Sequence, residues 1–539
     1  LLFNMSTTGL FSASQGLSDP AICLLASLVC VVPLGFLHRA VFNGKPKRIQ
    51  HLFFIITGLL LFYINYGGHT IHSLISIFVA YILCRYFKGT IESVVMAFVF
   101  FMSYLVIGYN VMSSGKYDLS WTMPQCVLTL RLIGLIVDLY DGMQPKEKLS
   151  AYQLEARVDD SPDLLEIAAF SYFFGGCFVG PQSRRREIFC SKFSTQPCLL
   201  KRTLKHSGPF LGSELKLYFA FFPLNRFRRF VDGAYNDAET GGPPKSVFPA
   251  MLRLFAGLVY GGVHLYFHPI YPTEFFLTDQ FMNYSFLWKL VYILFWFRFV
   301  VLRYQSAWLI AESGCILVGL GYNLDEKSGE QLWDGVRNIR LGRFELSASF
   351  QSIIDSFNYN TNKWAFNYFF KRLKFLGNKM LSHLLTLLFL ALWHGTYSGY
   401  FVCFLAEFVC IIAERQLVEM LNQHRHLKAK LQSSAMIYLP LWCVRKFVVL
   451  LSCAYGFLPF ALLTVDKWWK VYKSVYFFGW AMYGIVWPLI VVSYWFSRDW
   501  RRSKAGNGTI PAKENAQTNK PNATDEHNVD NAISKAKIN

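Results

Sequence analysis

The sequence has few charged residues for its length. Only 16% of its 539 residues are Asp, Glu, Lys or Arg, whereas 53% are hydrophobic and 17% are aromatic. This composition excludes an ordinary soluble domain, which needs more polar surface. Apolar stretches recur along the chain, and many are long enough to cross a bilayer. Because a spanning segment must satisfy its backbone hydrogen bonds internally, we predict an all-α polytopic membrane protein.

Clustered cysteines are also lacking. The chain has twelve cysteines, but none forms a Cys-x-x-Cys pair, and most lie inside apolar runs. Structural zinc sites and the disulfide frameworks of small secreted domains depend on such clusters. We therefore interpret the cysteines as small hydrophobic residues and predict no metal site.

Positive charge exceeds negative charge, with 53 Lys and Arg against 34 Asp and Glu and a formal net charge of +19. Such an excess can indicate a nucleic-acid-binding protein. Here the cations form short clusters between apolar spans, at residues 45–48, 184–186, 371–374 and 498–504. That pattern is typical of cytosolic loops and of contact with anionic headgroups. We predict membrane lipid, and no nucleic acid, as a partner.

The apolar stretches predict roughly eleven transmembrane helices. The candidates are residues 22–37, 52–66, 71–86, 91–111, 127–139, 248–267, 286–302, 307–322, 384–412, 437–463 and 475–496. Several carry charged residues that a helix surrounded by lipid tolerates poorly. Examples are Arg131, Asp138, Arg298, Glu312 and Glu407. We therefore expect a packed bundle that encloses a membrane-embedded polar chamber.

Two segments do not have the pattern of simple spans. Residues 164–182 contain paired glycines and end in Gly-Pro-Gln, which indicates a re-entrant segment that enters the membrane and bends. Residues 364–376 combine aromatic residues with three cations, which predicts an amphipathic helix at the interface. These cations have two interpretations, an anchor on anionic lipid or a contact with a polyphosphate ligand. They are Lys371, Arg372 and Lys374.

The ends of the chain differ from its middle. Residues 1–19 predict a soluble lead-in without the features of a cleavable signal peptide. Residues 20–500 form the membrane domain, in which residues 183–226 are a basic loop or insertion, and residues 501–539 predict a disordered cytosolic tail. The tail ends in Lys-Ala-Lys-Ile-Asn, which resembles a dilysine signal for retrieval to the endoplasmic reticulum. A cytosolic tail would keep the sequons at Asn507 and Asn522 unglycosylated.

His394 is the main candidate for chemistry. It lies in LLTLLFLALWHGTYSGY, residues 384–400, where the cost of a polar side chain in hydrocarbon points to function. Gly395, Ser398 and Gly399 leave room for a ligand. Because desolvation disfavours a charged imidazole, His394 would stay neutral near pH 7 and able to accept a proton as a general base. For each of the other histidines, a structural role is the simpler interpretation.

Three asparagines precede the predicted amphipathic helix, at Asn358, Asn360 and Asn362. They fit either a polar turn that caps the helix or an amide donor that helps hold a carbonyl during acyl transfer. The sequence has no Gly-x-Ser-x-Gly motif and no lone activated cysteine. Direct transfer from an activated donor therefore fits better than a covalent acyl-enzyme.

Several long motifs resemble those of the membrane-bound O-acyltransferase family and occur in the same order. They are residues 120–142, 163–182, 357–379, 387–404 and 466–477. Trp393-His394-Gly395 matches the catalytic histidine motif of the family, and Asn358 matches the asparagine that acts with it. In the branch that acts on phospholipids, Trp333-Asp334 matches a Trp-Asp motif and Gly180-Pro181-Gln182 a Gly-Pro motif. The basic segment 183–226 is longer than the resemblance leads us to expect.

The resemblance implies a multi-pass enzyme of the endoplasmic reticulum membrane that works in phospholipid remodelling, the Lands cycle. It implies transfer of an acyl chain, preferably polyunsaturated, from acyl-CoA to the sn-2 hydroxyl of lysophosphatidylcholine, with lysophosphatidylethanolamine or lysophosphatidylserine as further acceptors. His394 would be the base and Asn358 would hold the thioester or its oxyanion, with acyl-CoA as co-substrate and no cofactor. A homodimer is an open expectation. Substrate-binding candidates are Trp393, Gly395, Trp333, Asp334, Gly180, Pro181, Gln182, Lys371, Arg372 and Lys374.

Two alternatives stay open. A transporter or channel also shows buried charges and broken segments, although the sequence has no visible inverted repeat. An O-acyltransferase acting on a protein or sterol would share the histidine motif, but Trp333-Asp334 argues against it.

Overall fold

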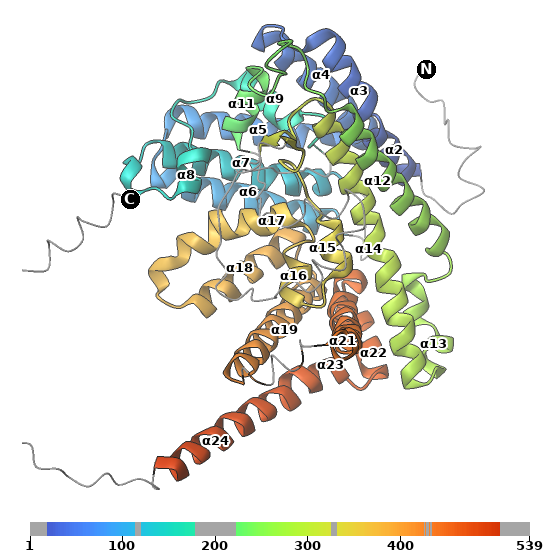
Figure 1. Cartoon of the computed structure of the whole chain (residues 1–539). Helices are drawn as coiled ribbons and strands as arrows, with labels where there is room; N and C mark the ends of the chain where they lie inside the picture. The colour runs from blue at the N-terminus through green and yellow to red at the C-terminus, as the bar shows by residue number, and fades with distance from the viewer. Residues whose placement is uncertain are drawn as a thin grey trace, which may run out of the picture. The chain divides into compact units, whose positions relative to one another are not determined.

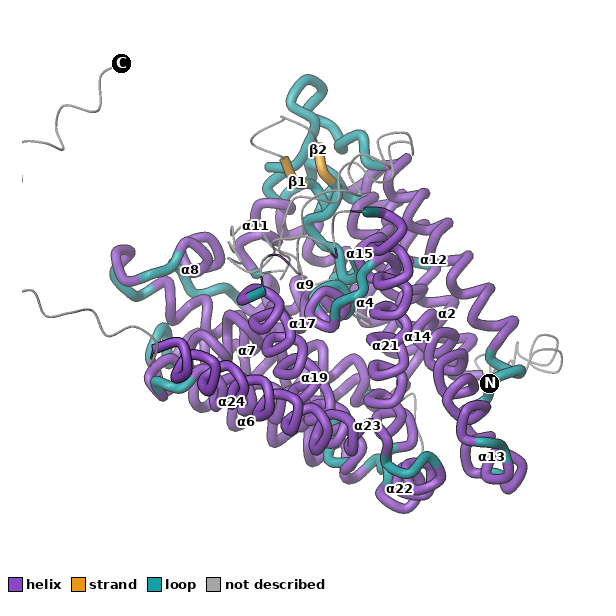
Figure 2. The backbone as a smooth tube through the Cα atoms, turned by 60° about the horizontal axis from the view of Figure 1, so that its bottom comes forward, coloured by secondary structure: helices purple, strands orange, loops and turns teal. Residues whose placement is uncertain are grey.

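The computed structural model describes residues 19–113, 120–177, 223–324, 331–424, 426, 431 and 434–506. Almost every element within them is a helix (Figure 1). In those ranges the only sheet is a short antiparallel ladder in which β1 (Asn323–Leu324) pairs with β2 (Gln331–Leu332) (Figure 2). The chain divides into two compact units, Leu1–Ile485 and Val486–Asn539. The predicted helical class is confirmed.

The first part of unit 1 is a set of apolar helices joined by short turns. Polar caps begin several of them: the Thr90 hydroxyl accepts a hydrogen bond from the Ser93 amide at α6, and Asp163 accepts one from the Glu166 amide at α9. The elements are α2 (Asp19–Val29), α3 (Val31–Leu37), η1 (His38–Phe42), α4 (Lys47–Tyr66), η2 (Gly67–Thr70), α5 (Ile71–Tyr86), α6 (Ile91–Val111), α7 (Thr122–Gly142), η3 (Lys146–Lys148), α8 (Ala151–Ala156) and α9 (Leu164–Tyr172).

The rest of the chain contains the longest helices. The elements are α11 (Leu224–Val231), α12 (Val247–Phe267), η5 (Thr273–Leu277), α13 (Asp279–Asn283), α14 (Phe286–Leu317), α15 (Leu341–Leu346), α16 (Phe350–Ile354), α17 (Tyr359–Trp364), η6 (Ala365–Phe369), η7 (Phe370–Leu376), α18 (Lys379–His394), α19 (Ser398–Gln423), α21 (Ala435–Leu462), α22 (Val465–Ser474), α23 (Phe478–Ala481), η8 (Met482–Val486) and α24 (Trp487–Gly506).

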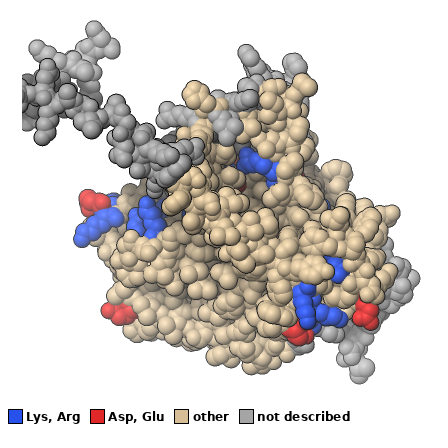
Figure 3. Space-filling view, turned by 90° about the horizontal axis from the view of Figure 1, so that it is seen from below, with Lys and Arg blue, Asp and Glu red and all other residues tan. Residues whose placement is uncertain are grey.

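Seven helical runs in the described residues are long and apolar enough to cross a membrane, by length and composition. They are Cys23–Phe42, Lys47–Tyr86, Ile91–Val111, Thr122–Gly142, Val247–Phe267, Ala435–Leu462 and Phe478–Arg498. The 40-residue run Lys47–Tyr86 is broken at Gly67, where φ is +53° and α4 ends. Seen from below, most of the surface in Figure 3 is occupied by uncharged residues, as expected for a membrane protein.

Two predictions about the spans are wrong. The candidate spans 286–302 and 307–322 form the single helix α14 of 32 residues. The polar residues that separated them in sequence lie inside this helix, where Ser306 donates a hydrogen bond to the carbonyl of Gly257 in α12 at 2.8 Å. Conversely, the candidate span 384–412 is two helices, α18 and α19, separated at Gly395.

Helix α7 is buried along most of its length, and its charged residues contact protein. The guanidinium of Arg131 donates to the carbonyls of Phe170 and Ser171 in the last turn of α9 and of Gly176 just after it, at 2.7–3.0 Å. The carboxylate of Asp138 accepts a hydrogen bond from the hydroxyl of Tyr368 at 2.7 Å. The prediction that charged spans pack inside a bundle is therefore confirmed for this helix.

The two unusual segments have different outcomes. Residues 364–376 do not form one interfacial helix: Trp364 and Tyr368 are buried, and the segment passes through the π-helical turn η6 into the 3-10 turn η7. Trp364 packs into the core, where it stacks on Phe389 of α18. The part of residues 164–182 that the structure describes is α9 followed by a buried turn, and Gly180, Pro181 and Gln182 lie outside the described residues.

Two of the predicted segment boundaries fall within helices. Most of the segment 183–226 lies outside the described residues, but its last residues belong to α11, which begins at Leu224. At the other end, α24 continues to Gly506, so the helix passes the predicted boundary at residue 500.

Candidate active site

His394 is the last residue of α18, and the glycine after it ends the helix. Asn378 caps the other end, where its side-chain oxygen accepts hydrogen bonds from the amides of Met380 and Leu381 at 2.9 and 3.1 Å. Gly395 has φ of +138°, which side-chain-bearing residues rarely adopt. A Cβ at this position would also lie 3.0 Å from the ring of Tyr400. Glycine therefore allows the chain to turn away and leaves the imidazole at a helix end.

Four aromatic rings surround the His394 imidazole, and we call them the aromatic cage. Their ring centroids lie 4.6 Å (Trp393), 5.0 Å (Phe460), 5.6 Å (Phe404) and 5.7 Å (Tyr400) from that of His394. The imidazole is half-buried, and its nitrogens make no hydrogen bond with any described residue. Both nitrogens are thus available to a ligand, and no ring of the cage carries a charge that would hold the imidazole protonated.

Hydrogen bonds fix the backbone just before His394. The hydroxyl of Tyr109 in α6 donates to the carbonyl of Trp393 at 3.0 Å. The indole nitrogen of Trp393 donates to the carbonyl of Cys126 in α7 at 2.8 Å. Two neighbouring helices therefore determine where α18 ends and where the imidazole points.

The segment after His394 is fixed in the same way. Thr396 donates to the side chain of Asn110 in α6 at 3.0 Å, and the Gly399 amide donates to the carbonyl of Leu463 at 2.9 Å. A Cβ on Gly399 would overlap the carbonyl of Pro459 in α21, so only glycine lets the two backbones come this close. The break between α18 and α19 is therefore held by α6 on one side and α21 on the other.

Asn358 precedes α17 in a strained conformation, with φ of +45° and ψ of +42°. Left-handed geometry is uncommon outside glycine, and asparagine is one of the few residues that tolerate it. The side-chain oxygen of Asn358 accepts a hydrogen bond from the Thr361 hydroxyl at 2.9 Å. The amide nitrogen has no partner among the described residues, so this geometry leaves an oriented donor.

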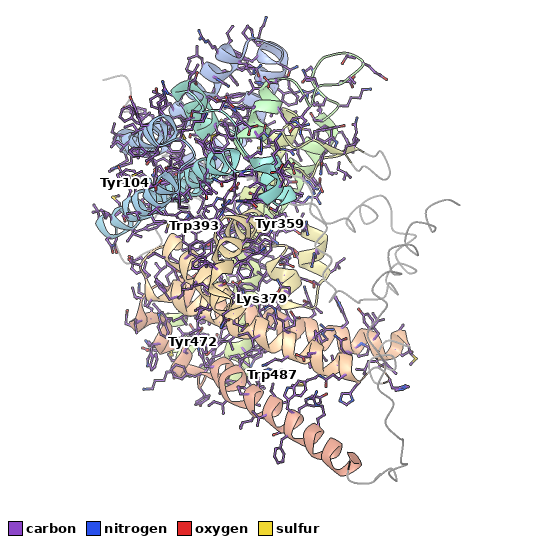
Figure 4. The ribbon with its side chains drawn as sticks, turned by 90° about the vertical axis from the view of Figure 1, so that its left-hand side faces the viewer. Tyr104, Tyr359, Lys379, Trp393, Tyr472 and Trp487 are labelled. Carbon is purple, nitrogen blue, oxygen red and sulfur yellow. The ribbon has the colours of Figure 1, made fainter. Side chains whose placement is uncertain are left out.

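Asn358 and His394 belong to neighbouring elements. Figure 1 draws α17 next to α18, and Figure 4 shows Tyr359 of α17 and Trp393 of α18 at a similar level. A series of ring contacts also connects the Asn358 region with the aromatic cage. Phe357, next to Asn358, lies 6.3 Å from Tyr304 in α14, and Tyr304 lies 6.4 Å from Phe457. Phe457 in turn stacks on Phe460 of the cage at 4.9 Å.

The other two asparagines differ from each other. The side chain of Asn362 donates to the carbonyls of Ile354 and Phe357 at 2.9 and 3.1 Å, which is the polar-turn role. Asn360 is 1% exposed, and neither its side-chain oxygen nor its nitrogen has a hydrogen-bond partner in the described residues. Such a group is costly to bury, and we have no structural explanation for it.

Trp333 and Asp334 contact the chain after α14. The ring of Trp333 packs edge-on against Tyr322 at 5.7 Å, and the carboxylate of Asp334 accepts a hydrogen bond from the side chain of Asn323 at 3.1 Å. These two residues therefore support the β1–β2 region. The rings of the aromatic cage come from other elements.

The three predicted cations are not equivalent. Arg372 makes a bidentate pair with the buried carboxylate of Asp141 in α7, at 2.6 and 3.1 Å. Lys371 lies over the ring of Phe366 at 5.0 Å, and Lys374 is exposed. Because its guanidinium is already engaged with Asp141, Arg372 has a structural partner that the sequence pattern did not reveal.

A second buried carboxylate is that of Glu312, which is 0% exposed in α14. It pairs with Arg253 of α12 at 3.1 Å and lies 3.8 Å from the guanidinium of Arg337. This cluster joins two helices to the chain that follows β2. Across the residues that the structure describes, no three His, Cys, Asp or Glu side chains are grouped as metal ligands.

Sequence reasoning missed most of the cage. Tyr400 and Phe404 are spaced as one face of a helix that starts at Ser398, so helical periodicity could have identified them. Phe460 comes from α21, and local sequence gave no signal for it. The same holds for Tyr109, whose hydroxyl bonds to a residue 284 positions away.

Comparison with known proteins gives a consistent family. The profile of the membrane-bound O-acyltransferase family matches residues 106–206 and 213–434. Lysophospholipid acyltransferase 5 of Caenorhabditis elegans is 36% identical over 488 residues, covering 90% of this chain and 94% of the relative. The human protein of that name is 38% identical over 468 residues, covering 87% and 88%. A lysophospholipid acyltransferase of Schizosaccharomyces pombe is 27% identical over 485 residues, covering 87% and 85%.

Proposed function

The chain belongs to the membrane-bound O-acyltransferase family, and on that premise we propose that it transfers an acyl chain from acyl-CoA to the free hydroxyl of a lysophospholipid. The supporting observation is a half-buried imidazole, unpartnered among the described residues, at a helix break inside an aromatic cage. Relatives named lysophospholipid acyltransferases, which align along most of their length, support the acceptor class.

In the proposed reaction, a nitrogen of His394 accepts the proton of the lysophospholipid hydroxyl. The hydroxyl oxygen forms a bond to the thioester carbonyl carbon, the carbon–sulfur bond breaks, and CoA leaves as a thiolate. The proton on the imidazole then passes to the thiolate or to water, which restores the base. General-base assistance of this kind contributes about 10²–10⁴-fold to the rate.

The proposed role of Asn358 is to donate a hydrogen bond to the thioester carbonyl oxygen as negative charge develops there. Its side-chain oxygen is occupied by Thr361, which turns the amide nitrogen outward as a donor. The strained backbone fits this role, since strain at active sites often holds a group in one orientation. A single lost donor of this type typically costs about 10²–10³-fold in kcat.

The finer assignments rest on the resemblance. We propose lysophosphatidylcholine as the main acceptor, with lysophosphatidylethanolamine and lysophosphatidylserine as further acceptors, and a preference for polyunsaturated donors. We also propose the endoplasmic reticulum membrane as the location, with a cytosolic C-terminal tail. These assignments place the protein in phospholipid remodelling. A protein or sterol acceptor and a transport function are the competing proposals.

The test uses the purified full-length protein in detergent or vesicles with labelled acyl-CoA. A panel of lysophospholipids, a sterol and a peptide serves as acceptors. We expect transfer to lysophospholipids, fastest to lysophosphatidylcholine, and loss of at least about 10²-fold in His394→Ala. His383→Ala is the matched control, because His383 lies in the same helix outside the aromatic cage. Equal activity of the two variants would remove His394 from the mechanism, and transfer to the sterol or peptide alone would assign a different acceptor.

A further inference from the structure

In unit 1, a pocket of about 180 Å³ lies between α11 with the turn after it and the chain that follows α14. It is lined by Arg226, Arg229, Ala234, Tyr235, Tyr322, Asn323 and Leu324. We call it the Arg226–Arg229 pocket. Strand β1, which Figure 2 shows paired with β2, forms part of one wall. No carboxylate is among the side chains that line it.

The two arginines keep free donors toward this pocket. Arg226 is buried, and its Nε and Nη2 atoms donate to the carbonyls of Leu320 and Tyr322. Its Nη1 atom has no partner among the described residues. Arg229 is exposed and makes no hydrogen bond or ion pair with any described residue.

Aromatic side chains hold these cations in place. The ring of Tyr235 lies 5.1 Å from the Arg226 guanidinium and 5.5 Å from that of Arg229, so it contacts both. Tyr235 is also 6.0 Å from Tyr322 on the opposite wall. Stacking on one ring orients both guanidinium groups and reduces the entropy that a ligand would otherwise have to overcome.

Two described acidic residues, one bonded to a pocket wall and one next to a wall in sequence, are already paired. Asp334 is bonded to Asn323, and Asp232 forms an ion pair with Lys47 at 2.6 Å. The third arginine of α11, Arg228, is neutralised by Glu166 and Asp160, each at 2.6 Å. The contrast within one helix is clear, since only Arg228 has carboxylate partners in the described residues. Among the described residues, therefore, no carboxylate compensates the charge of Arg226 or Arg229.

We propose that the Arg226–Arg229 pocket binds a phosphate group of a substrate. Guanidinium groups match the geometry of phosphate and form charge-assisted hydrogen bonds with it. The proposal rests on the proposed function for the identity of the substrate, because acyl-CoA and a lysophospholipid both carry phosphate. Trp333 and Asp334 then act as positioning residues, since they fix Tyr322 and Asn323 of the pocket wall.

The test is direct ligand binding to full-length protein in the His394→Ala background, which separates binding from turnover. The probes are labelled CoA, labelled dephospho-CoA and labelled lysophosphatidylcholine. Arg229→Gln is the test variant, because Arg229 makes no contact that the fold requires, whereas Arg226 also supports backbone carbonyls. The matched control is Arg85→Gln, which removes another exposed arginine, at the end of α5.

We expect Arg229→Gln to raise the Kd of one phosphate-bearing probe by about 5- to 20-fold, with partial recovery in Arg229→Lys. A higher Kd for CoA but not for dephospho-CoA would identify the 3′-phosphate as the group bound in the pocket. An equal rise for both would identify the pyrophosphate. A higher Kd for lysophosphatidylcholine alone would identify the lipid phosphate. Unchanged Kd for all three probes, or the same loss in Arg85→Gln, overturns the proposal. Arg229-dependent binding in the His394→Ala background, together with no transferase activity of the unsubstituted protein, would support the pocket and overturn the proposed function.

Discussion

Replacing Gly395 by alanine tests whether the helix break positions the imidazole. At φ of +138° the substitution forces an L residue into a backbone region that costs about 1–3 kcal/mol. The new Cβ would also lie 3.0 Å from the ring of Tyr400, so that ring must move by a few tenths of an ångström. Tyr400 contacts His394 at 5.7 Å, and its movement displaces the aromatic cage. Because small misplacements of reacting groups cost large factors in rate, we expect kcat to fall roughly 10- to 100-fold.

The assay compares kcat and thermal unfolding of Gly395→Ala with those of Gly377→Ala. Gly377 ends η7 with φ of +65°, and a Cβ there would have no neighbour within 4 Å. The control therefore carries backbone strain without contact with the cage. We expect both variants to lose stability and only Gly395→Ala to lose kcat. Equal kcat in the two variants would show that the glycine matters for folding alone and would refute the argument.

Three further substitutions test other parts of the site. Asn358→Asp keeps the side-chain shape and the tolerance for left-handed backbone but removes the amide donor. We expect kcat to fall about 10²–10³-fold with little change in unfolding temperature. Unchanged turnover would exclude Asn358 as an oxyanion donor. Tyr109→Phe removes the hydrogen bond to the Trp393 carbonyl, so kcat should fall several-fold while KM stays unchanged. Denaturant unfolding should show a free energy of unfolding lower by about 0.5–1.5 kcal/mol. Arg372→Gln leaves the buried Asp141 carboxylate without its cationic partner, with only the Gln153 amide still donating to it, and should destabilise the fold by about 3–5 kcal/mol. Lys374→Gln should not destabilise the fold, and equal stability of the two variants would contradict the ion pair.

The helical class and many of the apolar segments followed from the sequence, because both depend on local composition. The interior position of Arg131 and Asp138 also followed, since a charge in an apolar run needs protein around it. The number of spans did not follow. Polar residues within α14 indicated a break, but α12 packs beside them and the Gly257 carbonyl of α12 accepts a hydrogen bond from Ser306, so the helix continues.

The cations of residues 371–374 show a similar limit. Their spacing fits an exposed basic face, and nothing local reveals that Asp141, 231 residues earlier, pairs with Arg372. The aromatic residues of 364–376 indicated an interfacial helix, because the local pattern does not show which helix they contact. Trp364 and Phe369 stack on Phe389 of α18 instead, because this tertiary neighbour offers a surface for them.

By itself, the sequence determined that the chain folds as helices in a membrane, and it singled out His394 and Asn358 by their chemistry and by the motifs around them. Only the tertiary structure decided what surrounds these two residues. The aromatic cage is built by α18, α19 and α21 together, and the hydrogen bonds that fix its backbone come from α6 and α7. Such contacts join residues hundreds of positions apart, and they depend on how helices pack rather than on the local pattern that forms each helix.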